Sequence, residues 1–293
     1  VDVMENKPDQ ELSPTAADLA AVAGAFSAKG ITLHSELDED DLTNENFDAP
    51  TGLDFTKTWE SFEKIKKKHF GTKNERNSPA TISAKQLTHR YAIFGHAYDG
   101  SSGGTGEMWG DDFFVTLGLW KQQDSNATAP PDSERPPGGG GAPREKQGTY
   151  MHELGHTLGL AHGGSLWLDE KNDEDVEKNY KPNYHSVMNY LWQTPCEVND
   201  RWYQGWTLDY SAAQWPKLKE ATFDEWKGVS YAGQVNGQRQ DHGNKNAVFP
   251  VDPTNPVAKC HKKKNSVNLH FVPEAGQADW DNDNNIDTQT KAD

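Results

Sequence analysis

Three histidines and a glutamate between positions 152 and 162 have the types and spacing of a catalytic metal site. His152 and His156 are four residues apart, so on an α-helix of about 3.6 residues per turn they point the same way, within about 40° of each other. One helix face therefore presents two imidazoles to a single ion. Glu153, about 100° round the helix, lies beside that ion without having to bind it. The opposite side of the helix carries apolar side chains that can pack on a core: Met151, Leu154 and Leu158.

Gly159 and His162 complete the pattern. Gly159 follows the second histidine by three residues, and a glycine there can take the left-handed conformation that ends a helix and turns the chain back. This turn brings His162 towards the same ion. Three neutral imidazoles leave the fourth tetrahedral position of Zn²⁺ to water, as a catalytic zinc site requires, whereas four protein ligands normally close a structural site.

The stretch from His152 to His162 fits the pattern H-E-x-x-H-x-x-G-x-x-H and resembles the metzincin clan of zinc metalloproteases. A second stretch, Ser186-Val-Met-Asn-Tyr190, is similar to the Met-turn of serralysin- and astacin-like members. The resemblance implies that Met188 forms an apolar floor under the metal. It also implies that Tyr190 is a mobile fifth ligand or an oxyanion donor. The alternative is that both are ordinary core residues. The residue after the third ligand, which differs among metzincin families, matches none clearly, so no single family is assigned.

The same resemblance implies a zinc-dependent endopeptidase that acts on proteins or peptides. Glu153 would take a proton from the attacking water and pass it to the leaving amine. One rival interpretation is a thermolysin-like site whose third ligand is a downstream glutamate, and the turn at Gly159 with His162 argues against it. Another is a calcium-dependent binding or adhesion module with a vestigial zinc site. The intact Glu153 argues against that module.

The elements that position this site are read from hydrophobic periodicity. We expect helices over 15–29 and 56–70, capped by the Ser13-Pro14-Thr15 segment and by Thr56 or Thr58, strands over 31–37, 90–96 and 112–118, and a zinc-binding helix over about 148–159. This alternation predicts an α/β (α+β) metzincin-like fold, in which a twisted mixed sheet has a backing helix and an active-site helix. A low-complexity loop over 129–144 is expected to contain no regular element.

The predicted N-terminal catalytic subdomain covers residues 1–163, and a smaller, irregular C-terminal subdomain covers 164–293 with one helix near 218–226. In metzincins the edge strand beside the cleft binds substrate in an extended form. By that resemblance, one of the strands at 90–96 or 112–118 is expected to play this part. The Gly/Ser-rich link over 99–110 would then shape the rim of the cleft.

Composition limits the partners and suggests a compartment. The chain has 293 residues, a formal net charge of −16 and 33% hydrophobic residues. Such acidity argues against nucleic-acid binding, which needs a basic face. No apolar run approaches the roughly 18 residues of a membrane span, and no secretory signal opens the chain. Because it starts at Val1, we interpret it as a mature or trimmed form, and we expect a secreted, monomeric protein.

Two further features are consistent with an extracellular protein. Cys196 and Cys260 are the only cysteines, and they either form one disulfide or stay as two buried thiols. An acidic loop over 279–290 places carboxylates at positions 1, 3, 5 and 9 of an EF-hand-like calcium site; they belong to Asp279, Asp281, Asp283 and Asp287. Position 12 holds a threonine instead of a bidentate acid. A calcium site and a disordered acidic tail therefore both stay open.

Overall fold

The structure is a computed structural model, in which the described residues are 1–7, 11–43, 47–51, 54–98, 102–120, 141–164, 184–190, 192–195 and 206–211, with the backbone of short strands between 197 and 272. They belong to two compact units, Val1–Leu160 and Ala161–Asp293. The functional subdomains expected over 1–163 and 164–293 stay a prediction.

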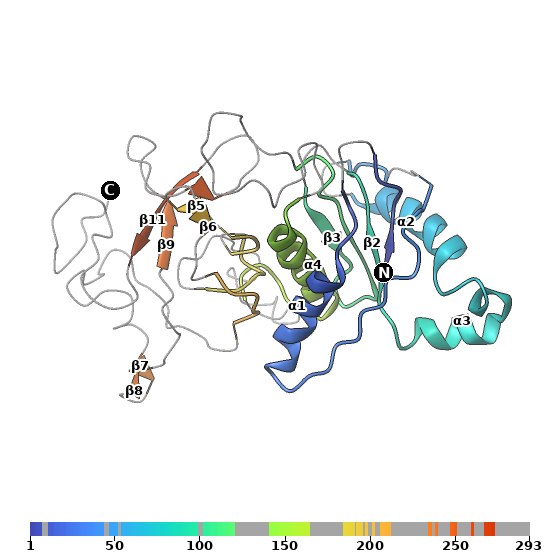
Figure 1. The fold of residues 1–293 in the computed structure, drawn as a ribbon, viewed down its shortest axis with the longest axis horizontal. Coiled ribbons are helices and arrows are strands. Elements are labelled where there is room, and N and C mark those ends of the chain that lie inside the picture. The colour runs from blue at the N-terminus through green and yellow to red at the C-terminus, as the bar shows by residue number, and fades with distance from the viewer. Residues whose placement is uncertain are drawn as a thin grey trace. The chain divides into compact units, whose positions relative to one another are not determined.

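An open four-stranded sheet is the centre of the first unit (Figure 1). Its strand order is β1 (Asp2–Val3), β2 (Tyr91–Phe94), β4 (Asp112–Val115) and β3 (Gly104–Gly106). β1, β2 and β4 run parallel, and β3 pairs antiparallel with β4. This mixed sheet packed against helices confirms the expected α/β class.

Helices cover both faces of the sheet because consecutive side chains of a strand point to opposite sides. On β4, Phe114 contacts the aromatic rings of α2 (Thr56–His69), whereas Phe113 meets Tyr150 of α4 (Pro143–Thr157) at 5.3 Å between ring centroids. Figure 1 accordingly shows α4 on one side of the strands and α2 on the other. The strands β1, β2 and β4 are short and fully buried, so α4 has a rigid support.

The first helix, α1 (Ala16–Ser27), packs against α4. Thr15 caps α1 in a reciprocal capping box, since its hydroxyl accepts the N–H of Asp18 and the Asp18 carboxylate accepts the N–H of Thr15. From α4, Lys146 donates to the carbonyl of Ser13 at 2.8 Å and Gln147 donates to the Asp18 carboxylate at 2.8 Å. The N-terminal segment is thereby tied to the outer face of α4.

The prediction of a strand over 31–37 is wrong, because this segment forms no β-ladder. Ile31 and Leu37 are 53% and 40% exposed, so the alternating pattern does not bury one face. The main chain nearby pairs with the N-terminal residues instead. The ammonium of Val1 donates to the carbonyl of Glu36, and the N–H of Val3 donates to that of Glu39.

The expected edge strand is also corrected. β2 and β4 are both internal in the sheet, and the strand beside β4 is β3, which lies in the stretch predicted to be a Gly/Ser-rich link. Glycines have a low strand propensity, so hydrophobic periodicity does not reveal such a strand.

The N-terminal cap of α2 also differs from the prediction of Thr56 or Thr58, since the Asp54 carboxylate accepts the N–H of Thr56 at 2.9 Å. A 3₁₀ turn (Glu75–Asn77) and α3 (Pro79–Gln86) follow α2.

The second unit contains antiparallel strands in a region where the sequence analysis assigned none. Five strands form a sheet in the order β6-β5-β10-β11-β9, and β7 and β8 form a separate pair. Their bounds are β5 Glu197–Val198, β6 Arg201–Trp202, β7 Gln234–Val235, β8 Gln238–Arg239, β9 Ala247–Pro250, β10 Lys259–Cys260 and β11 Val267–Val272. The helix predicted near 218–226 lies outside the described residues. In the described part of the chain, no helix has both the length and the apolar character of a membrane span.

Candidate metal centre

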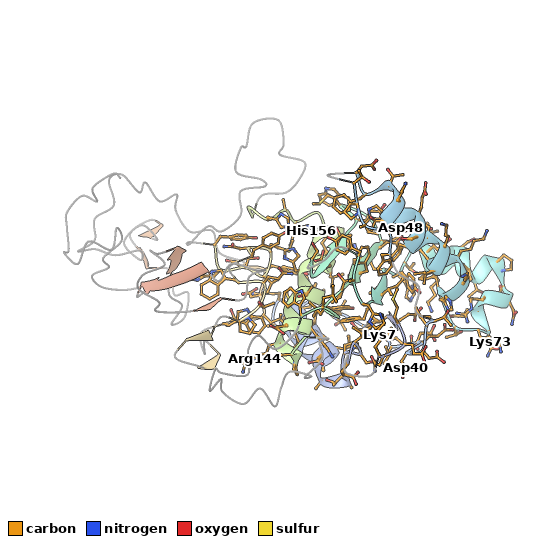
Figure 2. The ribbon with its side chains drawn as sticks, turned by 90° about the horizontal axis from the view of Figure 1, so that it is seen from above. Lys7, Asp40, Asp48, Lys73, Arg144 and His156 are labelled. Atoms are coloured by element: carbon orange, nitrogen blue, oxygen red, sulfur yellow. The ribbon has the colours of Figure 1, made fainter. Side chains whose placement is uncertain are left out.

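Helix α4 carries the first two histidines and begins five residues before the predicted start at 148. Pro143 stands in its first turn, where the missing N–H has no consequence. The Glu145 carboxylate accepts the N–H of Ala142 at 2.7 Å, which satisfies one of the free donors at this end. Figure 2 labels Arg144 and His156 at opposite ends of α4.

The C-terminal end of α4 is a Schellman turn. The N–H of Leu160 donates to the carbonyl of Gly155 at 3.0 Å, and the N–H of Gly159 donates to that of His156 at 2.8 Å. Gly159 has φ = +84°, the left-handed conformation that this motif needs at the position after the cap. The helix therefore ends in a turn defined by main-chain bonds, and His162 follows within three residues.

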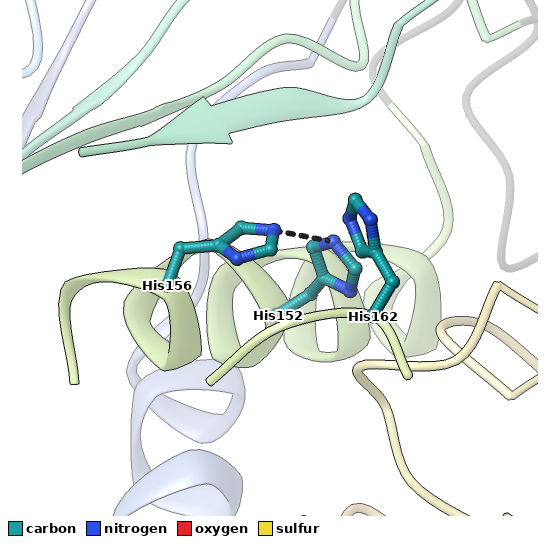
Figure 3. A group of neighbouring side chains, drawn as sticks. All are labelled: His152, His156 and His162. Atoms are coloured by element: carbon teal, nitrogen blue, oxygen red, sulfur yellow. Dashed lines mark hydrogen bonds between the residues drawn. The ribbon is translucent and has the colours of Figure 1, made fainter. Parts of the chain in front are cut away.

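His152, His156 and His162 form one cluster, in which a ring nitrogen from each lies within 4.8 Å of the others (Figure 3). The Nε2 atoms of His152 and His156 are 3.2 Å apart. Two nitrogens bound to one tetrahedral zinc at about 2.05 Å would be about 3.3 Å apart, so this pair fits the ion closely. His152 and His156 are buried at 1% and 8% exposure. The cluster is a buried three-histidine site consistent with zinc.

The protonation of these rings suits a metal. The Nδ1 of His156 lies 2.9 Å from the carbonyl of Leu160, which can only accept, so Nδ1 carries a proton and Nε2 is the nitrogen left to bind a metal. Burial lowers the pKa of His162 to about 4, so its ring is neutral at pH 7. Neutral imidazoles are the form that binds zinc.

Glu153 is buried between α4 and β3, at 3% exposure. Desolvation raises the pKa of its carboxyl group well above the ordinary value, with no opposing cation or hydrogen-bond donor among the described residues. A buried carboxyl group of raised pKa next to a cation site is the setting of a proton acceptor that works near neutral pH.

Two glycines of β3 allow the strand to approach α4 closely. A Cβ atom at Gly104 would lie 2.8 Å from Cγ of Glu153 and 2.3 Å from the carbonyl oxygen of Phe114. A Cβ atom at Gly106 would lie 2.4 Å from the carbonyl oxygen of Glu153 and 2.9 Å from Cβ of His156. Only glycine fits at these two positions without a shift of backbone or of the site residues.

Trp109 lies against the turn at the end of α4. It occupies the third position of a turn closed by the N–H of Gly110 and the carbonyl of Glu107 at 3.0 Å. Its φ is +60°, a region that costs an ordinary residue about 1–2 kcal/mol. Its own N–H donates to the carbonyl of His156 at 3.2 Å. Its indole covers Gly159, where an added Cβ atom would lie 2.2 Å from the ring.

The predicted Met-turn is compact and contains both of its key residues. Met188 is fully buried, and its N–H donates to the hydroxyl of Ser186 at 3.1 Å. The N–H of Val187 donates to the carbonyl of Asp209 at 2.9 Å. Tyr190 is 40% exposed, and its ring centroid lies 4.6 Å from that of His162. The phenol of Tyr190 is therefore next to the third imidazole, while its chemical role stays a prediction.

A second group of potential ligands already has a protein partner. Glu107, Asp111 and Asp112 bring carboxylate oxygens together. Lys66, however, places its ammonium 2.7 Å from Asp112 and 3.2 Å from Asp111. A buried lysine that makes these contacts takes the place of a cation, so we assign no metal here.

Three residues that shape the site were not predicted from the sequence: Gly104, Gly106 and Trp109. A glycine at every second position, Gly104 and Gly106, was a signal of close backbone approach. Trp109 gave no local signal. The calcium loop with Asp279, Asp281, Asp283 and Asp287 lies outside the described residues. The same holds for Cys196 and for the side chain of Cys260, so the disulfide stays a prediction.

No protein-family model, no curated protein and no solved structure matches the chain.

Proposed function

We propose that this protein is a secreted zinc-dependent endopeptidase, with His152, His156 and His162 as the metal ligands. One observation carries the proposal: three imidazoles lie close enough together to bind one ion, and the buried carboxyl group of Glu153 lies on the next residue after the first of them. Three nitrogen ligands suit a catalytic zinc with one open position. The chain's strong acidity and its pair of cysteines support an extracellular location.

A zinc ion bound there would supply Lewis-acid chemistry, by lowering the pKa of a water molecule and by polarising the scissile carbonyl. Glu153 accepts the proton of the attacking water, because its burial gives it a raised affinity for protons. It then delivers this proton to the departing amine. The hydroxyl of Tyr190, beside His162, donates a hydrogen bond to the oxyanion of the substrate.

The edge position of β3 supports a peptide as substrate. β3 is the last strand of its sheet, and it pairs on one side only among the described residues. An extended peptide can add to such an edge through main-chain hydrogen bonds. Gly104 of the same strand lies against Glu153, so a peptide bound along β3 would pass beside the proton acceptor.

The test combines metal analysis with a cleavage assay. The wild-type protein is expected to contain about one zinc per chain and to cleave casein or a quenched peptide library, with activity lost on chelation and restored by zinc. Glu153→Gln is expected to keep the zinc and lose roughly 10²–10⁴-fold in kcat, because only the proton acceptor is removed. His156→Ala is the comparison, since it should lose both metal and activity. An active Glu153→Gln protein would remove Glu153 from this role. A zinc-loaded wild-type protein that cleaves no peptide would refute the protease assignment.

A further inference from the structure

The turn that contains Trp109 has an unusual residue in its most demanding position. Among the described non-glycine residues of the turn, only Trp109 has a positive φ, which is the pattern of a type II turn. That position favours glycine or asparagine. Gly110 is the very next residue, yet the chain places the tryptophan, and not the glycine, in the left-handed conformation. Such strain persists only where surrounding contacts hold it, and it concentrates at functional sites.

Two contacts of Trp109 lie at the end of the helix that carries His152 and His156. Its main-chain N–H donates to the carbonyl of His156, which also accepts the N–H of Gly159. Its indole covers the Cα of Gly159 so closely that no side chain fits there. One residue of the loop between β3 and β4 thus fixes both a ligand residue and the turn that leads to His162.

We propose that Trp109 is a positioning residue for the zinc ligands, an inference that rests on the proposed metal centre. Its main-chain hydrogen bond to His156 holds the last turn of α4 in position. Its indole keeps the turn at Gly159 from opening. His162 reaches the ion only while this turn is closed, so Trp109 acts on the metal through the third ligand. The indole is 47% exposed, so burial of a core side chain does not account for its place.

Two substitutions separate positioning from general stability. Trp109→Gly removes the indole but relieves the positive φ, so the metal-free protein should unfold at the same temperature as wild type or higher. Its zinc dissociation constant should nevertheless rise about 10–100-fold, the usual effect of losing a group that orients a ligand. Trp109→Phe keeps a flat ring over Gly159 and should recover most of the affinity. Leu119→Ala, which shortens a side chain of similar exposure, is the control and should change neither quantity.

The cobalt-substituted proteins give a readout that a purely structural role would not change. The visible absorption of Co²⁺ reports coordination geometry. We expect Trp109→Gly to alter this spectrum at saturating cobalt, and Trp109→Phe and Leu119→Ala to preserve the wild-type spectrum. Unchanged zinc affinity and spectrum in Trp109→Gly would overturn the inference while the metal centre stands. Zinc binding without peptide cleavage in wild type would overturn the protease and leave the role of Trp109 intact. A wild-type protein that binds no zinc would overturn both.

Discussion

Thr149 buries a hydroxyl group about one turn before His152. Its side chain is fully buried, and its oxygen has no hydrogen-bond partner in the described part of the chain. An unsatisfied buried hydroxyl costs about 1–3 kcal/mol. We therefore expect Thr149→Val, which keeps the shape, to leave stability unchanged or to raise the melting temperature by roughly 2–4 °C.

Thr116 is the matched control for Thr149. It is equally buried, but its hydroxyl donates to the carbonyl of Ser102 at 2.9 Å. Thr116→Val should lose about 1 kcal/mol because this bond disappears. Equal losses in the two valine variants, measured by thermal unfolding, would mean that the Thr149 hydroxyl is paired after all.

Because of Glu75, the stability of the fold is expected to fall as the solution becomes acidic. Its carboxylate accepts the ammonium of Lys85 at 2.8 Å and the N–H of Thr72 at 2.7 Å, and these bonds lower its pKa to about 2 from an ordinary 4.5. A carboxyl group with a depressed folded-state pKa stabilises the fold above pH 4.5, and this contribution is lost as the pH falls from 4.5 to 2. Glu75→Gln should therefore be less stable than wild type at pH 6, with a difference that vanishes near pH 2.

Urea unfolding midpoints measured between pH 6 and pH 2 test this prediction for Glu75. Glu60→Gln, on the exposed side of α2, removes the same charge and is the control. The unfolding midpoint of Glu60→Gln should differ from that of wild type by the same amount at every pH in this range. A gap for Glu75→Gln that stays constant down to pH 2 would contradict the predicted titration.

At the scale of elements, the contact between β3 and α4 determines the geometry of the site. Gly106→Ala places a Cβ atom 2.4 Å from the backbone of Glu153, so strand and helix must separate. We expect a loss of about 1–3 kcal/mol, typical of overpacking, together with weaker zinc binding. Gly24→Ala is the opposite case, because nothing lies within 4 Å of a Cβ atom there in the middle of α1. It should stabilise by roughly 0.5–1 kcal/mol. Thermal unfolding and zinc titration of both variants measure the contrast, and a harmless Gly106→Ala would show that the two elements are not in close contact.

Local patterns predicted the elements whose signal is contained within a few residues. The spacing from His152 to His162 foretold the three-histidine cluster, because helix pitch and one glycine turn fix where these side chains point. The helices α1 and α2 and the strands β2 and β4 agreed with periodicity for the same reason. The boundaries of the elements were predicted less accurately, since α4 begins at Pro143 and not near 148.

Features that depend on distant partners were missed or wrong. Residues 31–37 alternate as a strand would, but they join no β-ladder in the described part of the chain, and the main chain from Glu36 onward contacts the N-terminal residues beside β1 instead. β3 exists because Gly104 and Gly106 fit against α4, a partner almost 50 positions away. Trp109 contacts Gly159, from which it is separated by a similar number of positions in the sequence. No short stretch of sequence contains information on these long-range contacts. The three-histidine cluster was therefore predicted from the sequence, and the contacts that hold it were not.

For the whole molecule, zinc should act as a stabilising ligand. An ion that binds only the folded chain adds about 2.7 kcal/mol at a free concentration 100 times its dissociation constant, which corresponds to roughly 5–10 °C in melting temperature. We expect this shift on adding zinc to metal-free wild type and its absence in His156→Ala. Calcium added to the zinc-loaded protein tests the loop over 279–290, since a second shift would support an additional cation site. A zinc-induced shift that persists in His156→Ala would place the ion elsewhere.

The cap at the end of α4 has a kinetic consequence. Its hydrogen bonds run between main-chain groups of Gly155, His156, Gly159 and Leu160, so they do not require an ion to form. The ring of His156 is likewise already oriented by the carbonyl of Leu160. Metal uptake then needs no coupled folding step, and its observed rate should rise linearly with ion concentration without reaching a plateau set by a slow rearrangement of the chain.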